Sequence, residues 1–323
     1  MTTTPPSWKV VNNNSSDVVV VGRQGRIPTP GLRILGEAEM DYRKEFRVEP
    51  DGKLKLSKID PAYTGKHVSE DEAKEEVEAY RHKLFHLQGL LYAENKRSVL
   101  VVLQGLDAAG KDGTIKHVFS AINPQGVSVA SFKAPTPEER AHDFLWRVHP
   151  HAPPRGHISI FNRSHYEDVL VPWVHKLIDK TTWNAREKDI RHFESLLAQN
   201  GTAILKFFLY ISREEQLARF AQRLDDPARN WKISESDYTE REYWDDYIEA
   251  FESGIPATSA KEAPWYVIPS NHKWFRNLAV SQIMASTMEE LRMEFPKPSV
   301  DLRDIRRKYH AAVEEERRHN HSS

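Results

Sequence analysis

Residues 98–116 read SVLVVLQGLDAAGKDGTIK, and this stretch decides the fold. An apolar run over 99–103 leads into the spacing Gly105-x-x-x-x-Gly110-Lys111, and a helix-compatible segment follows. A buried strand, a loop bounded by glycines and a helix N-terminus together predict a phosphate-binding P-loop. The glycines let backbone N–H groups surround phosphate oxygens, the helix dipole favours an anion, and Lys111 adds a full positive charge.

Two acidic residues distinguish this loop from the usual P-loop. Asp112 follows the lysine, where a P-loop normally carries Ser or Thr, and Asp107 lies within the loop. Two carboxylates would repel phosphate unless a cation lies between them. We therefore predict a divalent metal here, Mg²⁺ or alternatively Mn²⁺. The competing interpretation is a glycine-rich turn with a solvated lysine.

Composition narrows the class of protein. The chain has 323 residues, no cysteine and a formal net charge of −1. Disulfides, thiolate catalysis and cysteine-based zinc sites are thereby excluded. The balanced charge argues against a general nucleic-acid binder. The sequence also lacks an apolar run near the roughly 18 residues of a membrane span and a signal-peptide layout at its start. We expect a cytoplasmic protein with no nucleic-acid or membrane partner.

Strand-like and helix-like segments alternate along the chain, which predicts a parallel sheet covered on both faces. The expected fold is a three-layer α/β/α P-loop kinase fold. We expect a partly irregular extension over 1–50, one domain over 51–300 and a charged tail over 301–323. The predicted strands are 99–103, 127–132, 157–161, 203–211 and 265–269, and the predicted helices are 69–91, 137–148, 213–224, 243–251 and 278–291.

A second polar cluster follows the strand predicted at 157–161. It reads Asn-Arg-Ser-His-Tyr-Glu-Asp over 162–168, and the carboxyl ends of parallel strands are where ligands bind. We expect Arg163 to bind phosphate, and Glu167 and Asp168 to bind metal or to orient Arg163. The alternative is a strand-end turn whose acids simply pair with arginines.

A basic segment, RFAQRLDDPARNWK, has the composition of a mobile cover over a phosphoryl-transfer site. Arg219 and Arg223 are four residues apart and would share one helix face, and Lys232 follows the bend. Lys133 follows another predicted strand. A solvated charged face is the alternative interpretation.

Histidines and aromatic residues carry weaker signals. His142, His149, His151 and His157 are scattered and lack metal-ligand spacing, so surface or supporting roles are expected. Core packing is the default for the aromatic residues, with base stacking as the alternative; these are Trp231, Tyr238, Tyr243, Trp244, Tyr247 and Trp265.

Four segments together resemble the polyphosphate kinase 2 family: GLDAAGKDG, FNRSHYEDV, RLDDPARNWK and WYVIP. The resemblance spans roughly residues 50–295. It implies a thymidylate-kinase-like fold with a helical lid at about 213–250. It also implies Mg²⁺-dependent phosphoryl transfer between inorganic polyphosphate and a nucleotide, with a basic channel for the polyphosphate.

The second motif departs from the common family pattern. Many members read F-D-R-S-W-Y-N, whereas this chain reads F-N-R-S-H-Y-E, so that acid and amide exchange places at Asn162 and Glu167. This variant resembles the subgroup that phosphorylates AMP as well as ADP. Trp173 stands where that subgroup often has arginine, which puts one channel contact in doubt.

We therefore expect a polyphosphate-dependent kinase that converts AMP to ADP and ADP to ATP, as a homo-oligomer (dimer or tetramer). The alternatives are an ATP-dependent nucleotide or small-molecule kinase and a non-enzymatic or GTPase-like binding module. Residues expected in catalysis are Lys111, Asp112, Arg163 and Arg223. Those expected to bind phosphate or polyphosphate are Gly105, Gly110, Lys111, Lys133, Arg219 and Lys232; to bind nucleotide, Asn162 and Glu167; and to bind metal, Asp107, Asp112 and Asp168.

Overall fold

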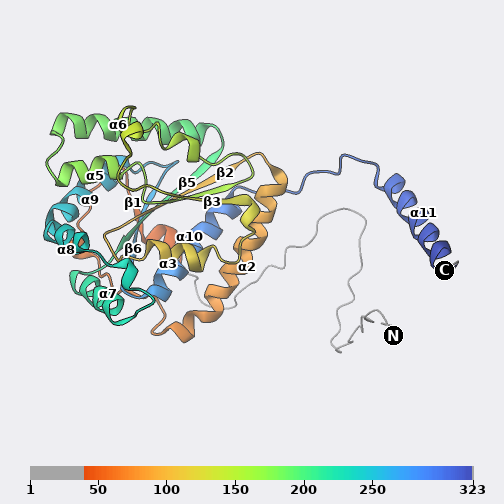
Figure 1. Cartoon of the computed structure of the whole chain (residues 1–323), viewed down its shortest axis with the longest axis horizontal. Coiled ribbons are helices and arrows are strands. Elements are labelled where there is room, and N and C mark those ends of the chain that lie inside the picture. The colour runs from red at the N-terminus through yellow and green to blue at the C-terminus, as the bar shows by residue number, and fades with distance from the viewer. Residues whose placement is uncertain (1–39, 322–323) are drawn as a thin grey trace. The chain divides into compact units, whose positions relative to one another are not determined.

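The apolar runs of the sequence form one twisted sheet in the computed structural model, which describes residues 40–321 (Figure 1). Its six strands lie in the order β1-β6-β5-β2-β4-β3. β1 pairs antiparallel with β6, and the other neighbours pair in parallel. The predicted parallel sheet is confirmed. The strands are β1 (Arg47–Val48), β2 (Ser98–Gln104), β3 (Val127–Ser131), β4 (Ile158–Asn162), β5 (Thr202–Tyr210) and β6 (Trp265–Pro269).

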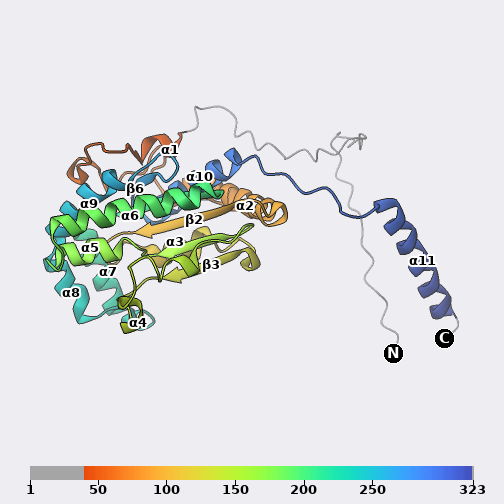
Figure 2. The same ribbon diagram turned by 90° about the horizontal axis from the view of Figure 1, so that it is seen from above.

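Both faces of the sheet are covered by helices, as Figures 1 and 2 show. Alternate residues of β2 point to opposite faces. Val99, Val101 and Leu103 join one core cluster with α2, α3 and α10, and Leu100 and Val102 join the other with α5, α6 and α9. A strand buried on both faces must be apolar throughout, which explains the uninterrupted run before the P-loop.

Several helices, among them α2, α6 and α7, begin at polar caps. Ser69, for example, accepts a hydrogen bond from the Glu72 N–H at the start of α2. The helices are α1 (Tyr42–Glu45), α2 (Glu70–Glu94), α3 (Lys111–Val118), α4 (Pro137–Arg140), α5 (Glu167–Val174), α6 (Lys180–Gln199), α7 (Arg213–Asp225), α8 (Glu235–Glu242), α9 (Trp244–Thr258), α10 (Lys273–Glu290) and α11 (Leu302–His321).

The helix predicted over 137–148 is wrong beyond Arg140. α4 ends there, and turns and bends lead to a short 3₁₀ turn over His149–His151. The Asp143 carboxylate accepts a hydrogen bond from the Leu145 N–H at 3.0 Å. Such a local side-chain bond competes with helical hydrogen bonds, and a proline follows at 150.

The extension expected over 1–50 is too long. Tyr42 is 1% exposed and stacks on Phe46, and β1 pairs with β6 through Arg47 and Val48. These residues therefore belong to the sheet and its core. The rest of the predicted extension, residues 1–39, lies outside the described residues.

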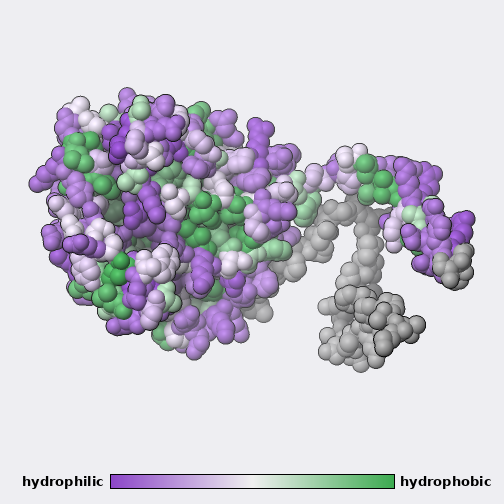
Figure 3. Space-filling model, viewed as in Figure 1, coloured by the Kyte–Doolittle hydropathy of each residue, from purple (hydrophilic) through white to green (hydrophobic). Residues whose placement is uncertain are grey.

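The surface mixes hydrophilic and hydrophobic residues, and Figure 3 shows small hydrophobic patches on a largely hydrophilic face. Large exposed apolar side chains include Phe85 and Tyr92 on α2 and Val129 on β3. Within the described residues, no helix is both long and apolar enough to span a bilayer. The charged segment after 301 forms α11.

Candidate active site

The P-loop lies between β2 and α3, and two of its glycines are sterically required. Gly105 has φ of +154°, and a Cβ there would lie 2.8 Å from the Leu209 carbonyl oxygen. Gly110 caps α3 in the left-handed region with φ of +107°, and a Cβ would overlap the Arg276 guanidinium. Only glycine satisfies both conditions, so the loop can present backbone N–H groups at the N-terminus of α3.

Lys111, the first residue of α3, is held against its own loop. Its Nζ donates to the carbonyl oxygens of Gly105 at 2.6 Å and Leu106 at 3.2 Å. Burial, with the nearby positive charge of Arg163, lowers the pKa of Lys111, although acidic neighbours oppose that effect. The ammonium is thereby placed in the loop without a one-to-one carboxylate partner.

Arg163 leaves the end of β4 in the left-handed region, with φ of +61°. Its guanidinium is 2.9 Å from Asp107 Oδ1 and 3.7 Å from Glu167 Oε2. Burial raises the pKa of Glu167, and Arg163 and Lys111 only partly offset this. The arginine thus joins the second motif to the P-loop, as predicted from the parallel strands.

Asp112 connects the P-loop to two further segments. Its carboxylate accepts hydrogen bonds from Asn162 Nδ2 at 2.8 Å and from Lys232 Nζ at 3.4 Å. Burial raises the pKa of Asp112, but Asn162, Lys232 and the nearby charge of Lys111 together outweigh it and the net shift is downward. An ionised carboxylate therefore stands at the start of α3, between the end of β4 and the bend at Asn230–Lys232.

The arrangement combines anion-binding and cation-binding groups in one place. Lys111 and Arg163 both interact electrostatically with Asp107, Asp112 and Glu167. β2 and β4 are neighbouring parallel strands, so their carboxyl ends present the two motifs at the same edge of the sheet. Such a site can neutralise phosphates with cations and offer hard oxygen ligands to a divalent metal.

A family model for polyphosphate kinase 2 matches residues 67–296 of the chain. The chain belongs to the polyphosphate kinase 2 family. The match confirms the family predicted from the sequence motifs.

Individual relatives support the same assignment. An AMP/ADP-polyphosphate phosphotransferase of Meiothermus ruber is 50% identical over 256 residues, covering 79% of this chain and 96% of that protein. An ADP-polyphosphate phosphotransferase of Rhodopseudomonas palustris is 45% identical over 270 residues, covering 79% and 92%. The crystal structure of polyphosphate kinase 2 from Arthrobacter aurescens TC1 aligns with a TM-score of 0.81 and 38% identity, covering 87% of this chain and 99% of that one. The predicted kinase fold is confirmed by this match.

Arg219 is not placed for phosphate binding in this polyphosphate kinase 2 family member. It is 5% exposed, and its Nε bonds Glu215 at 2.7 Å. Its Nη atoms donate to the carbonyl oxygens of Ala108, Ala109, Ser270 and Asn271 at 2.5–3.0 Å. Because its donors are engaged by the protein, Arg219 fastens α7 to the P-loop instead of binding polyphosphate.

Asp168 also departs from its expected role. Its carboxylate bonds Arg147 at 2.7 Å, and burial raises its pKa despite that partner. Arg186 donates to its backbone carbonyl. Asp168 is thus an ion-pair partner beside α6, whereas Asp107 and Asp112 face the site cations. We do not retain it among the expected metal ligands.

Two further predicted cations are Arg223 and Lys133. Arg223, on α7, donates to the Lys232 carbonyl at 3.0 Å and lies 3.7 Å from Asp237. It therefore stabilises the bend at Asn230–Lys232. Lys133 is exposed and follows β3, and its carbonyl accepts a hydrogen bond from Arg147.

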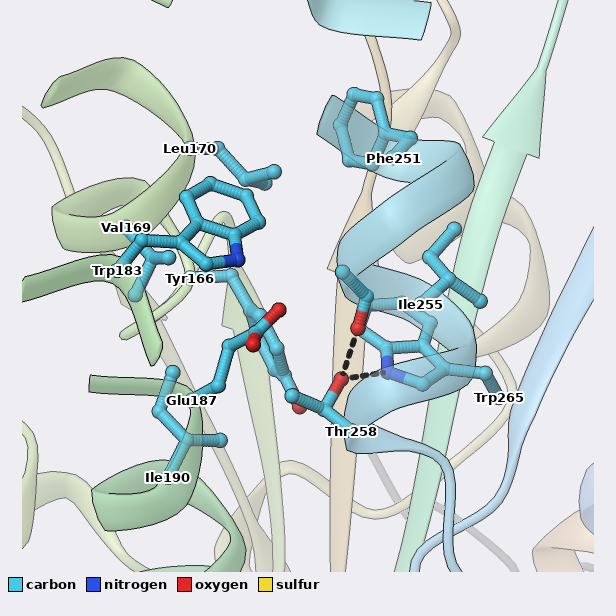
Figure 4. Close-up of a pocket in the computed structure, with 11 residues that line it drawn as sticks. Tyr166, Val169, Leu170, Trp183, Glu187, Ile190, Phe251, Ile255, Thr258 and Trp265 are labelled. Atoms are coloured by element: carbon cyan, nitrogen blue, oxygen red, sulfur yellow. Dashed lines mark hydrogen bonds between the residues drawn. The ribbon is translucent and has the colours of Figure 1, made fainter. Parts of the chain in front are cut away.

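A buried polar network holds two residues of the second motif, His165 and Tyr166. Glu194 bonds Lys206 at 2.5 Å, the Tyr166 hydroxyl at 2.9 Å and the His165 ring at 3.1 Å. Figure 4 shows Tyr166 beside the neighbouring cavity and the bond from Trp265 to Thr258. That cavity has a volume of about 10 Å³, room for little more than one water molecule, so it is not a substrate site.

The aromatic residues follow the default expectation in part. Trp244 and Trp265 are buried, whereas Trp231, in the bend at Asn230–Lys232, is 78% exposed with Lys232 over its ring.

Arg276 is the residue that the sequence analysis missed. It is 2% exposed, lies on α10 and packs against Gly110 and Gly113 of the P-loop region. It is far from the loop in sequence, so no local motif points to it. The one indirect signal is Gly113 inside a helix, because a helical glycine often marks a close approach by another group.

Proposed function

We propose that this chain catalyses reversible phosphoryl transfer between inorganic polyphosphate and adenine nucleotides, converting AMP to ADP and ADP to ATP. The observation that carries the proposal is the joint position of Lys111 and Arg163 among the carboxylates at the ends of β2 and β4. Membership of the polyphosphate kinase 2 family and the names of its relatives in Meiothermus ruber and Rhodopseudomonas palustris support the two substrates.

The mechanism requires positioning and charge neutralisation more than proton transfer. Phosphoryl transfer passes through a loose transition state, and an acceptor phosphate oxygen is already ionised near neutral pH. Lys111, Arg163 and Arg223 are the proposed cations for the moving group. Lys111 and Arg163 are held by the loop and by β4, so their charges need little reorganisation at the moment of transfer.

We propose Asp107 and Asp112 as the residues that would hold Mg²⁺, with Mn²⁺ as a substitute. Within the described residues, no group of three or more histidine, aspartate or glutamate side chains forms a ready metal cluster. Mg²⁺ is commonly bound by one or two carboxylates together with substrate phosphates and water, and the carboxylates of Asp107 and Asp112 match this pattern. When bound, the ion would neutralise phosphate charge.

The lid over 213–250 and the polyphosphate path are further proposals. α7, the bend at Asn230–Lys232 and α8 carry Arg223 and Lys232, and Lys232 reaches Asp112 across the site. A polyphosphate chain would meet Lys133, Lys232 and Arg163. Asn162 and Glu167 are the proposed nucleotide contacts, and their bonds to Asp112 and Arg163 would couple the acceptor to both motifs.

The assay supplies polyphosphate or ATP as donor, AMP or ADP as acceptor, and Mg²⁺, with nucleotides separated by chromatography. We expect ADP to rise first from AMP and polyphosphate, followed by ATP. Transfer from ATP but not from polyphosphate would instead identify an ATP-dependent kinase. If ADP reacts while AMP stays inert, or AMP stops at ADP, the dual-acceptor proposal is wrong although the kinase proposal stands. A cytoplasmic location and a homo-oligomeric state stay predictions.

A further inference from the structure

The environment of Arg276 differs from that of an ordinary buried arginine. It is 2% exposed, yet its Nε and Nη2 bond the neutral Asn277 side chain at 3.2 and 2.9 Å. Within residues 40–321 it forms no ion pair with a carboxylate, and the neighbouring charge that acts on its pKa is that of another cation, Arg219. Burial and Arg219 lower the pKa of Arg276 to about 9. A buried charge without a counter-charge lowers the stability of the fold, so a buried arginine in this place calls for a functional explanation.

The P-loop is shaped around this side chain. Arg276 Nη1 lies 3.5 Å from the Ala109 carbonyl oxygen, which also accepts a bond from Arg219 at 3.0 Å. A Cβ on Gly110 would overlap the Arg276 guanidinium, and one on Gly113 would lie 3.1 Å from its Nη2. The glycines at 110 and 113 therefore make room for an arginine as well as for a ligand.

The geometry links this contact to anion binding. In a trans peptide, the carbonyl and the following N–H point in opposite directions. Because the Ala109 carbonyl faces the two arginines, the Gly110 N–H points away from them, at the N-terminus of α3. N–H groups at this position of a P-loop are the ones that contact phosphate.

We infer that Arg276 is a positioning residue of the phosphate site: it holds the Ala109–Gly110 peptide from behind, and a phosphate in the loop provides the negative charge that Arg276 lacks in the protein. The inference rests on the proposed phosphate-binding function of the loop. It assigns a functional reason to Gly113, which the P-loop spacing alone does not explain.

The test compares Arg276→Met, which keeps length without charge, with Arg276→Lys, which keeps charge. Arg292→Met, at an exposed arginine just after α10, is the control for the change in net charge. Binding of inorganic tripolyphosphate is measured from the rise in thermal unfolding temperature, without nucleotide. The Michaelis constant for polyphosphate and kcat are measured separately.

We expect Arg276→Met to weaken tripolyphosphate binding by about 10-fold or more and to raise the polyphosphate Michaelis constant in parallel. Arg276→Lys should recover part of the affinity, and Arg292→Met should match the wild type. Wild-type tripolyphosphate affinity in folded Arg276→Met would overturn the inference. That result is the one expected if Arg276 only stabilises the fold.

Gly113→Ala provides the second variant if Arg276→Met does not fold. Alanine is favoured inside a helix, so its effect reports the contact with Arg276. Weaker tripolyphosphate binding by folded Gly113→Ala supports the inference, and unchanged binding overturns it. The assay also separates the two proposals. Anion binding that depends on Arg276 in a protein inactive with polyphosphate would refute the proposed function alone.

Discussion

Lys111 occupies the point where the loop, the helix and the second motif meet. Its ammonium bonds two carbonyl oxygens of its own loop, and its side chain lies among the charged groups of the two motifs. Lys111→Ala should therefore leave the fold intact and lower kcat/KM by about 10²–10³-fold, the usual cost of removing one electrostatic group. Steady-state kinetics and thermal unfolding measure the two effects, and Lys116→Ala, at an exposed lysine of the same helix, is the control. Near-normal turnover by Lys111→Ala would refute its catalytic role.

Asp107 tests the proposed metal. Asp107→Asn keeps the shape of the side chain but removes a charge beside Arg163. We expect a higher Mg²⁺ concentration for half-maximal activity and a lower kcat, because a neutral amide is a weaker ligand for a hard cation. Titration of activity with Mg²⁺ measures both the half-maximal concentration and kcat. Asp168→Asn is the control, because Asp168 pairs with Arg147 and is not among the proposed metal ligands. Full wild-type activity in excess EDTA would show that the carboxylates serve another purpose.

The sequence predicted the contacts that follow from two motifs at adjacent strand ends. It did not predict side-chain orientations that depend on packing between segments distant in sequence. Lys111, Arg163 and Asp107 come together because two motifs end adjacent parallel strands. The spacing of Arg219 and Arg223 placed both on α7, as the structure has them, but could not show that Arg219 is turned toward backbone carbonyls. Arg276 comes from a helix remote in sequence, so only the assembled fold reveals it.

Among the elements, the bend at Asn230–Lys232 makes a charged contact with the start of α3. Lys232 bonds Asp112, and both side chains are partly exposed, so the pair contributes little to stability. We expect the polyphosphate Michaelis constant to rise with salt, since a polyanion releases counterions when it binds several cations.

Lys232→Ala should reduce the slope of log KM against log salt by about 1 without changing the unfolding temperature. Lys188→Ala, on exposed α6 surface, is the control. A slope that is unchanged by Lys232→Ala would remove Lys232 from the polyphosphate path.

Several elements were predictable where apolar periodicity is strong, although the long helix α6 was not predicted. The strands around the P-loop and the long helix before it were found within a few residues, because burial on both faces leaves a continuous apolar pattern. β1 was missed for two reasons. It has only two residues, too few to show an alternating apolar pattern, and it is recognised as a strand only by its pairing with β6. The turns after α4 were missed because Asp143 bonds locally inside an otherwise helix-like stretch.

For the molecule as a whole, the buried Glu194 network ties α6, β5 and the second motif together. Burial raises the pKa of Glu194, but Lys206 and His165 outweigh it and the net shift is downward. A carboxyl pKa that is lower in the folded state than in the unfolded state adds stability above the unfolded value of about 4.3. That stability is lost as the pH falls through the folded value.

Glu194→Gln should lower stability at pH 7 by about 3–5 kcal/mol, because Lys206 would remain buried without its partner. Its free energy of unfolding should also change less than that of the wild type as the pH falls below about 4.3. Denaturant unfolding at several pH values measures both, and Asp189→Asn, an exposed acid of α6, is the control. A parallel pH dependence in Glu194→Gln and the wild type would contradict the assignment.

The short antiparallel strand at the sheet edge also limits how far the chain can be shortened. Removing residues 1–50, where the sequence suggests a domain border, would delete Tyr42 and Phe46 from the core and strip β1 from β6. The uncovered strand reads Trp-Tyr-Val-Ile-Pro, an apolar edge of the kind that recruits other chains and seeds aggregation. We expect a protein beginning at residue 51 to precipitate on expression, and one beginning at Met40, which keeps β1, to stay in solution. A shortened enzyme must therefore keep β1 to cover the apolar edge of β6, although β1 lies well before the proposed phosphate-binding residues in the sequence.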